Sequence, residues 1–255
     1  MRIARFEYRG KVAYGSVDPG KGEIRELDGS PFEGIRPTGA PRRLADVRLL
    51  APVVPSKIVA IGLIYKDHAR EMRKAIPEEP LIFLKAPSAL NHPGGDVVYP
   101  RASLRVDHEA ELAVVIGRKA KDVSEREARS VILGYTCFND VTARDLQAKD
   151  VQYARAKGFD TFAPVGPWIE TDLDPSALSI RCLVNGQARQ DSNTREMGKS
   201  VFALVEHIAH VMTLYPGDIV ATGTPPGVGP VKPGDVMTVE IEGIGSLTNR
   251  VVAAA

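Results

Sequence analysis

The acidic residues Glu109, Glu111 and Asp140 have the types and spacing of a divalent-metal site. Glu109 and Glu111 stand in VDHEAELAVVIG (106–117), where they precede an apolar run that is typical of a buried strand. Side chains two residues apart share one face of a strand, so both carboxylates point the same way and repel each other unless a cation lies between them. Asp140 ends the next apolar run, at the mouth of a second buried strand, where a third ligand is expected. Mg²⁺ and Mn²⁺ prefer such oxygen ligands.

Each of these acidic residues also has a purely structural interpretation. Glu109 and Glu111 could be two solvated carboxylates on an exposed strand edge. Asp140 could cap a helix expected over residues 142–155, for which Thr142 is a further candidate cap. Asp145 is a rival ligand inside the same expected helix.

Two further groups of residues could do acid–base or binding chemistry. His68 and Glu71 are three residues apart on an expected helix, and a carboxylate against an imidazole fixes its tautomer and strengthens it as a base, although such pairs are usually found on surfaces. Arg144 and Gln147 have the same spacing and share a helix face. The segment ATGTPPGVGP (221–230) is an apolar strand that breaks into a glycine-rich loop, which suits either close approach to a ligand or an ordinary turn.

Several common catalytic motifs are absent from the sequence. The segment MGKS (197–200) resembles the end of a phosphate-binding loop, but the glycine needed at position 193 is Asn193. His108 begins a zincin-like pattern whose second histidine position is Leu112. There is neither a G-x-S-x-G elbow nor a G-x-G-x-x-G that opens a helix after a strand. ATP chemistry, serine hydrolysis and hydride transfer therefore lose support.

The elements that must position these residues are mostly short strands. We predict a small β-rich module over 1–50 and a main domain over 51–255, giving an α+β, β-dominated fold. Arg9-Gly10 and Asn185-Gly186 are expected hairpin turns, and PGGDVV, PGDIV and PGDVM each suit a type II turn that starts a strand. The expected strands are 2–8, 11–17, 57–63, 81–85, 111–117, 131–140, 178–184, 186–190 and a pair within 236–252. The expected helices are 65–74, 124–131, 142–155 and 199–214.

The composition is that of an ordinary globular protein. The 255 residues include 33 Lys and Arg against 32 Asp and Glu, and this balance gives no reason to expect a nucleic acid or a membrane surface as partner. No apolar run approaches the roughly 20 residues of a transmembrane helix, and the N-terminus lacks a signal core. Cys137 and Cys182 stand in apolar, strand-like runs, which predicts reduced core thiols and a cytoplasmic location.

Taken together, these pieces resemble the fumarylacetoacetate hydrolase family over roughly residues 56–252. The matching stretches are KIVAIGLIYKDHAREM, PLIFLKAPSAL, VDHEAELAVVIG, GYTCFNDVTARDLQ, KGFDTFAPVGPW and VMTLYPGDIVATGTPPGVG. The resemblance implies a rolled mixed β-sandwich with flanking helices, after a small N-terminal module, usually in a homodimer. It also implies that Mg²⁺, or alternatively Mn²⁺ or Ca²⁺, binds to Glu109, Glu111 and Asp140.

The resemblance assigns roles to six other residues. His68 and Glu71 match the family's catalytic dyad on a mobile lid helix, and Lys157, a lone lysine in ARAKGFDTF, matches its active-site lysine. The positions that match residues holding the substrate's oxygens are Arg144, Gln147 and Thr224.

The implied chemistry is that of a metal-dependent enzyme acting on a 2-oxo acid. Such a substrate chelates the metal through its carboxylate and 2-oxo oxygen, and the metal stabilises the enolate formed when a neighbouring bond breaks. The chain resembles the branch of 2-hydroxyhepta-2,4-diene-1,7-dioate isomerases and 5-carboxymethyl-2-oxo-hex-3-ene-1,7-dioate decarboxylases, from aromatic catabolism, so an enolisable 2-oxo dicarboxylate is the expected substrate. The alternatives are hydrolysis of an acylpyruvate or fumarylpyruvate, and decarboxylation or tautomerisation of oxaloacetate. A non-catalytic metal-binding protein is the alternative of another class.

Overall fold

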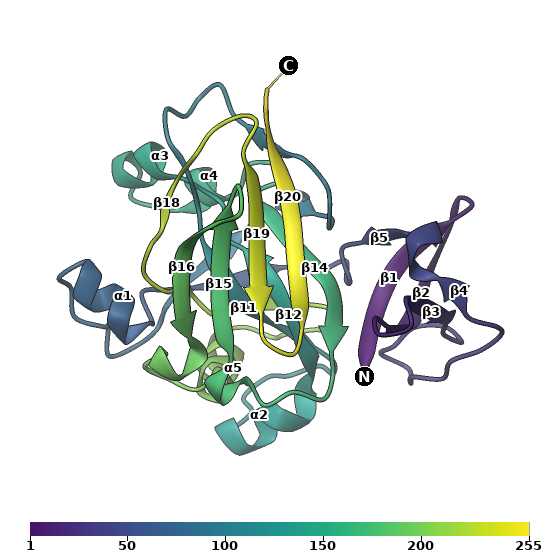
Figure 1. The fold of residues 1–255 in the computed structure, drawn as a ribbon. Helices are drawn as coiled ribbons and strands as arrows, with labels where there is room; N and C mark the ends of the chain where they lie inside the picture. Colours follow the sequence, from purple (N-terminus) through teal and green to yellow (C-terminus); the bar gives the residue numbers. More distant parts are fainter. Residues whose placement is uncertain (255) are drawn as a thin grey trace.

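The computed structural model describes residues 1–254 and is dominated by strands (Figure 1), which confirms the β-dominated α+β prediction. Arg9 and Gly10 both have positive φ, as the predicted hairpin turn requires. The strands of the N-terminal region are β1 (Arg2–Tyr8), β2 (Lys11–Asp18), β3 (Glu23–Glu26), β4 (Arg42–Arg43) and β5 (Arg48–Leu50). They lie together at one side of the molecule, and β1 joins them to the main sheet by pairing Ile3 with Ile169.

The main sheet has the order β4-β3-β2-β1-β14-β12-β11-β17-β6-β7, with β5 paired to β1 and β8 paired to β14. It mixes directions, since β17 runs parallel to β6 while β11 and β12 are antiparallel. Its remaining strands are β6 (Ile58–Gly62), β7 (Leu81–Lys85), β8 (Leu90–Asn91), β11 (Ala110–Ile116), β12 (Ile132–Asn139), β14 (Ala163–Glu170) and β17 (Ile219–Ala221).

A second sheet, of order β16-β15-β19-β20-β9, lies over β11, β12 and β14 (Figure 1). The positive φ of Asn185 and Gly186 confirms the hairpin between β15 and β16, and the positive φ of Gly94, Gly217 and Gly234 fits the three predicted Pro-Gly turns. The strands of this sheet are β9 (Val97–Tyr99), β15 (Ser179–Val184), β16 (Gln187–Asn193), β19 (Val236–Ile241) and β20 (Gly245–Ala253). A three-stranded sheet contains β10 (Val106–His108), β13 (Thr142–Ala143) and β18 (Gly229–Val231).

The helices are short, and two of the predicted ones begin at serine caps. Ser124 forms a capping box with Glu127, and the side chain of Ser200 accepts a hydrogen bond from the backbone of Ala203. Among residues 1–254, no helix is long and apolar enough to cross a bilayer. The α-helices are α1 (Lys66–Glu71), α2 (Glu125–Val131), α3 (Arg144–Lys149), α4 (Ala154–Lys157) and α5 (Val201–Val211). Single 3₁₀ turns are Leu44–Asp46, Pro87–Ala89, Pro175–Ala177 and Thr194–Glu196.

The prediction of one helix over 142–155, capped by Thr142 or Asp140, is wrong. Thr142 pairs with Asp107 of β10 as part of β13, and its hydroxyl donates to the carbonyl of Asp140 at 2.8 Å. The backbone of Asp150 is extended, which ends α3 and separates it from α4. Because residues 142 and 143 pair with β10, α3 begins later than the helical periodicity of the sequence predicts. That periodicity also gave no sign of the break between α3 and α4.

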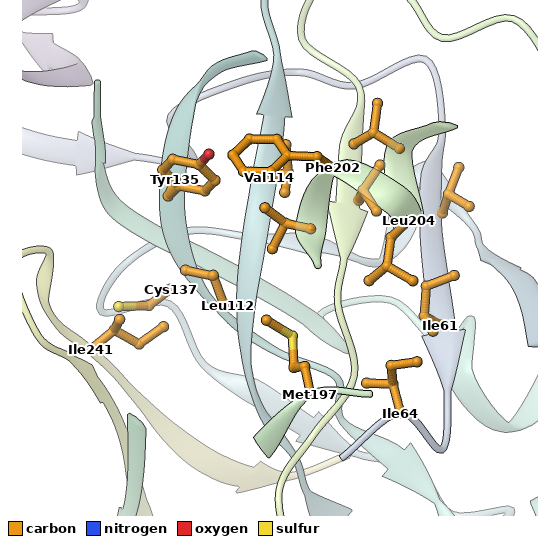
Figure 2. Close-up of a cluster of buried hydrophobic side chains, with 14 of the residues drawn as sticks. Ile61, Ile64, Leu112, Val114, Tyr135, Cys137, Met197, Phe202, Leu204 and Ile241 are labelled. Carbon is orange, nitrogen blue, oxygen red and sulfur yellow. The ribbon is translucent and has the colours of Figure 1, made fainter. Parts of the chain in front are cut away.

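Apolar side chains fill both faces of β11, which is buried along its whole length. Leu112 and Val114 point to one face, where they pack with residues of α5 and the second sheet such as Leu204 and Ile241 (Figure 2). Ala113 points to the other face, in a second cluster. Since side chains alternate along a strand, Glu111 shares the face of Ala113, and the neighbouring strands hold it rigidly.

The two cysteines are free and buried, as predicted for core thiols. Cys137 of β12 and Cys182 of β15 both belong to the cluster between the two sheets. Burial raises the pKa of each thiol, Cys182 to about 12, so neither is activated as a nucleophile.

Candidate active site

A cavity of about 430 Å³ opens where the ends of β7, β11 and β12 meet α1, α3 and α4. The residues predicted to carry chemistry come to it from segments far apart in the chain. Of the predicted site residues, all but Glu71 line this cavity: His68, Glu109, Glu111, Asp140, Arg144, Gln147, Lys157 and Thr224.

The three predicted metal ligands lie together on the floor of the cavity. One carboxylate oxygen of each of Glu109, Glu111 and Asp140 lies within 4.8 Å of the other two, and all three residues are buried. The strand register brings them together, because Ala110 pairs with Asn139 and the backbone N–H of Asp140 donates to the carbonyl of Glu109 at 2.8 Å. Because Glu109 and Glu111 are buried, they are not solvated carboxylates on an exposed strand edge, which was the structural alternative. The rival ligand Asp145 instead accepts hydrogen bonds from Ser103 and Leu104.

Two buried lysines hold the carboxylate of Asp140. Lys157 Nζ lies 2.5 Å from Asp140 Oδ2 and 2.9 Å from Glu109 Oε2. Lys85 Nζ lies 2.6 Å from Asp140 Oδ1 and also donates to the carbonyl of Val141 at 3.2 Å. Burial disfavours the charged form of Lys157, but Asp140, Glu109 and Glu111 outweigh it and raise its pKa above the ordinary value.

The guanidinium of Arg144 is shared among three partners. It forms a short ion pair with Glu109 Oε1, lies 2.9 Å from Asp107 Oδ2, and donates to Gln147 Oε1 at 2.6 Å. Arg144 and Gln147 therefore share one face of α3, as their spacing predicted. Burial alone would raise the pKa of Glu109, but Lys157 and Arg144 outweigh it and lower that pKa to about 2.

Glu111 differs from the other two carboxylates because it contacts no cation within residues 1–254. Its Oε2 accepts a hydrogen bond from the backbone N–H of Gly223 at 2.9 Å. Burial, with Asp140 and Glu109 beside it, raises the pKa of Glu111 well above the ordinary value. A buried carboxylate without a cation, facing two others, fits a hard divalent cation such as Mg²⁺. Glu109, Glu111 and Asp140 would hold that ion.

His68 and Glu71 form the predicted pair on α1. His68 Nδ1 lies 2.9 Å from Glu71 Oε2, and the other carboxylate oxygen of Glu71 accepts from the backbone N–H of Gly227 at 3.1 Å. Helix α1 is also tied to β16 by Asp67, whose carboxylate accepts from Ser192 Oγ at 2.5 Å. His68 lines the cavity, and its contact with Glu71 fixes the orientation of the imidazole ring. This arrangement suits proton transfer.

The loop that follows β17 lies along β11. Thr222 donates to the carbonyl of Leu112, Gly223 to Glu111, and Thr224 Oγ1 to the carbonyl of Ala110. Two glycines of this loop lie close to other parts of the protein: a Cβ on Gly223 would lie 2.7 Å from Ile64, and one on Gly227 would lie 2.1 Å from the backbone oxygen of Arg189. Close packing against the protein therefore accounts for these two glycines.

Sequence reasoning assigned no role to three buried residues of this region. Lys85 ends the apolar strand β7, and Asp107 holds Arg144 from behind. Gln190 links β16 to Ala110 and Thr224. A lysine at the end of an apolar strand is an unusual pattern that could have drawn attention to Lys85. Asp107 and Gln190 have no comparable signal, because the site residues that they hold, Arg144 for Asp107 and Thr224 for Gln190, lie far away in the sequence.

Comparison with known proteins identifies both parts of the chain. Residues 57–252 match the family described as Fumarylacetoacetate (FAA) hydrolase C-terminal, and residues 1–52 match the family described as Rv2993c-like, N-terminal. The structure is similar to that of 2-hydroxyhepta-2,4-diene-1,7-dioate isomerase from Mycobacterium marinum, with a TM-score of 0.93 and 46% identity over 100% of this chain and 99% of that one.

Relatives with other named activities are also similar. The 2,4-didehydro-3-deoxy-L-rhamnonate hydrolase of Sphingomonas sp. is 42% identical over 274 residues, covering 98% of this chain and 96% of the relative. The mitochondrial oxaloacetate tautomerase fahd2 of Xenopus laevis is 44% identical over 221 residues, covering 82% of this chain and 69% of the relative. The family match, the fold and the extent of these similarities agree, and this chain belongs to the fumarylacetoacetate hydrolase family.

Proposed function

We propose that this protein is a divalent-metal-dependent enzyme that isomerises or decarboxylates an enolisable 2-oxo dicarboxylate. The observation that carries the proposal is the buried triad of Glu109, Glu111 and Asp140, in a cavity that His68 and Lys157 also line. Within this triad Glu111 contacts no cation of the described residues 1–254. When bound there, Mg²⁺ would supply Lewis acidity that polarises a 2-oxo group. The named activity of the Mycobacterium marinum protein supports this substrate class.

The chain's own residues would bind the substrate and move its proton. His68 is held by Glu71 through Nδ1, and its other ring nitrogen, which has no hydrogen-bond partner in the described part of the chain, would take or return a proton next to the 2-oxo group. Lys157 would offset negative charge that develops on the substrate, and Gln147 would contact substrate oxygens from the cavity wall. The same dyad could activate a water molecule, which is why hydrolysis is the second candidate, favoured by the named activity of the Sphingomonas relative.

The function is tested by a turnover screen with Mg²⁺, read by ultraviolet absorbance. The candidate substrates are 2-hydroxyhepta-2,4-diene-1,7-dioate, oxaloacetate and acylpyruvates. We expect the highest kcat/KM with the heptadienedioate. Faster cleavage of an acylpyruvate would establish the hydrolase, and metal binding without turnover of any substrate would establish a non-catalytic protein. Homodimer formation, which the family resemblance implies, and a cytoplasmic location, which the cysteines and the N-terminus suggest, stay predictions.

The cavity offers one cation for the far carboxylate of a dicarboxylate. Lys74 lines the cavity on the segment after α1, and its ammonium has no carboxylate partner within residues 1–254. By contrast, Arg144 and Lys157 are already paired with protein carboxylates. The lining of the same cavity also includes the apolar residues Leu81 and Phe83, which suit a hydrocarbon chain.

Lys74→Gln should therefore weaken the binding of 2-oxoheptanedioate and spare that of 2-oxoheptanoate, two ligands that differ only in the far carboxylate. Because the pair would be partly exposed, we expect a loss of about fivefold in affinity, measured by calorimetry with Mg²⁺ present. Lys66→Gln, at the start of α1 and outside the cavity lining, is the matched control. Equal losses for both ligands would show that Lys74 does not recognise the far carboxylate.

We also predict that Lys157 acts as a charge and not as a Schiff-base nucleophile. Its raised pKa keeps the ammonium protonated at neutral pH, and a protonated amine cannot attack a carbonyl. Lys157→Arg should keep part of the activity, since the positive charge remains while the geometry changes. Borohydride added during turnover should leave the mass of the Lys157 peptide unchanged, and a trapped adduct there would refute the electrostatic role.

A further inference from the structure

Gln190 of β16 makes hydrogen bonds that fix the direction of the hydroxyl of Thr224, a residue that lines the cavity. The side chain of Gln190 is fully buried. Its Oε1 lies 2.9 Å from the backbone nitrogen of Ala110 and 3.1 Å from His108 Nδ1. Its Nε2 lies 2.8 Å from Thr224 Oγ1 and 2.8 Å from the carbonyl oxygen of Pro225.

These partners allow only one orientation of the Gln190 amide. The backbone N–H of Ala110 can only donate, and the carbonyl of Pro225 can only accept. The oxygen of the amide must therefore face Ala110, and its NH₂ group must face Pro225 and Thr224. With the amide reversed, its NH₂ group would face the N–H donor of Ala110, and its oxygen would face the carbonyl acceptor of Pro225. Each of these contacts would leave a buried polar group without a hydrogen bond, which costs free energy.

The fixed amide in turn fixes the hydroxyl of Thr224. Because an amide nitrogen has no acceptor capacity, Gln190 donates to Thr224 Oγ1. The hydroxyl proton then points to the carbonyl oxygen of Ala110, 2.8 Å away. A hydroxyl has one proton and two acceptor sites, so the only capacity that Thr224 has left is to accept one hydrogen bond, and Thr224 lines the cavity.

We propose that Gln190 is a positioning residue that makes the Thr224 hydroxyl an acceptor-only group in the cavity. At this point the site would recognise a proton-bearing group of the ligand, such as the hydroxyl of an enol or of a 2-hydroxy acid, and not a bare carboxylate oxygen. The inference deepens the proposed function and rests on it for the ligand class. It also makes the expected role of Thr224 more specific: the family resemblance implies a residue that holds substrate oxygens, and here it would accept a hydrogen bond from a substrate hydroxyl.

The orientation of the hydroxyl can be measured without any ligand. In protein isotopically labelled at threonine, nuclear magnetic resonance spectra should show slow exchange of the Thr224 hydroxyl proton with water. The reason is that this proton is donated to the carbonyl oxygen of Ala110 and that Thr224 is buried. Gln190→Met keeps the shape of the side chain and removes its hydrogen bonds, so the same proton should exchange faster. Fast exchange in the unaltered protein would overturn the proposal, whatever reaction the enzyme catalyses, and the turnover screen separately tests the function.

The selectivity is tested with oxalate, which has only acceptors when ionised, and 2-hydroxybutanoate, which has a hydroxyl donor. Thr224→Val preserves the shape of the side chain and should weaken the binding of 2-hydroxybutanoate by about tenfold, the usual value of one hydrogen bond, with oxalate affinity unchanged. Thr224→Ser keeps the hydroxyl and should restore the difference between the two ligands. Gln190→Met should lower the ratio of the affinity for 2-hydroxybutanoate to the affinity for oxalate, and should leave the affinity for Mg²⁺ unchanged. If Thr224→Val weakens oxalate as much as the hydroxy acid, Thr224 is a donor and the proposal is wrong.

Discussion

Replacing Glu111 with glutamine should abolish Mg²⁺ binding and Mg²⁺-dependent turnover without destabilising the metal-free protein. Glu111 is the member of the triad that contacts no cation within residues 1–254, so its neutral isostere leaves no charged group without a partner. Removing one of three carboxylate ligands greatly lowers the affinity of such a site for a hard cation. The measurements are calorimetric titration with Mg²⁺ and turnover of the best substrate from the screen.

The raised pKa of Glu111 gives this prediction a second, thermodynamic readout. The unfolded carboxyl titrates near pH 4.3, so its ionisation costs the folded, metal-free protein nothing below that pH. The cost grows as the pH rises toward the folded pKa, because the unfolded chain ionises first. At neutral pH the melting temperature of metal-free Glu111→Gln should therefore exceed that of the unaltered protein. Added Mg²⁺ should raise the melting temperature of the unaltered protein only.

Asp140→Asn is the informative comparison, because Asp140 holds two buried lysines as well as the proposed metal. Within residues 1–254, losing its charge leaves Lys85 with no carboxylate partner and Lys157 with an ion pair to Glu109 alone. Breaking a buried ion pair in this way costs about 3–5 kcal/mol, so this variant should lose both activity and stability. Full activity of either variant, or of the unaltered protein in the presence of a chelator, would show that the triad is not a catalytic metal site.

Replacing His68 with alanine should lower kcat by about 10²–10⁴, the usual contribution of a general acid–base group, and leave Mg²⁺ affinity nearly unchanged. His68 lines the cavity, and the structure groups the triad without it. If calorimetry showed that His68→Ala loses Mg²⁺ binding, His68 would be a ligand and its assignment as a proton carrier would be wrong.

Glu71→Gln tests how the imidazole is oriented. Oε1 of Glu71 accepts from the backbone N–H of Gly227, which would keep the amide oxygen of a glutamine on that side. The amide NH₂ would then face His68 Nδ1, which lies 2.9 Å from Glu71 Oε2, and would force the other tautomer. We expect a fall in kcat that approaches the one for His68→Ala, with KM little changed. Unchanged kcat in Glu71→Gln would show that Glu71 has no part in orienting the base.

Local sequence pattern determined much of this site. The apolar run after Glu109 predicted a buried strand, and the two-residue period of strands predicted that Glu109 and Glu111 share a face, which the triad geometry confirms. The spacing of His68 and Glu71 predicted their contact across one helical turn. Turns followed the same rule, since Asn185-Gly186 has the positive φ values that its residue types favour. Each of these features depends on residues only a few positions apart.

The tertiary structure alone decided which charges meet. Lys85 and Asp140 are 55 residues apart, and the pairing of β11 with β12 brings Asp140 beside Glu109. The pairing of β13 with β10 overrode helical periodicity at Thr142. Tertiary packing also brought Gln190, 34 residues away in the chain, against Thr224. Sheet order and register are set by the burial of whole faces against distant partners, and a single strand's sequence leaves those partners open. The sequence therefore specified the reactive side chains and their faces, whereas the packing of distant strands decided the ion pairs and hydrogen bonds that set the charge and orientation of each.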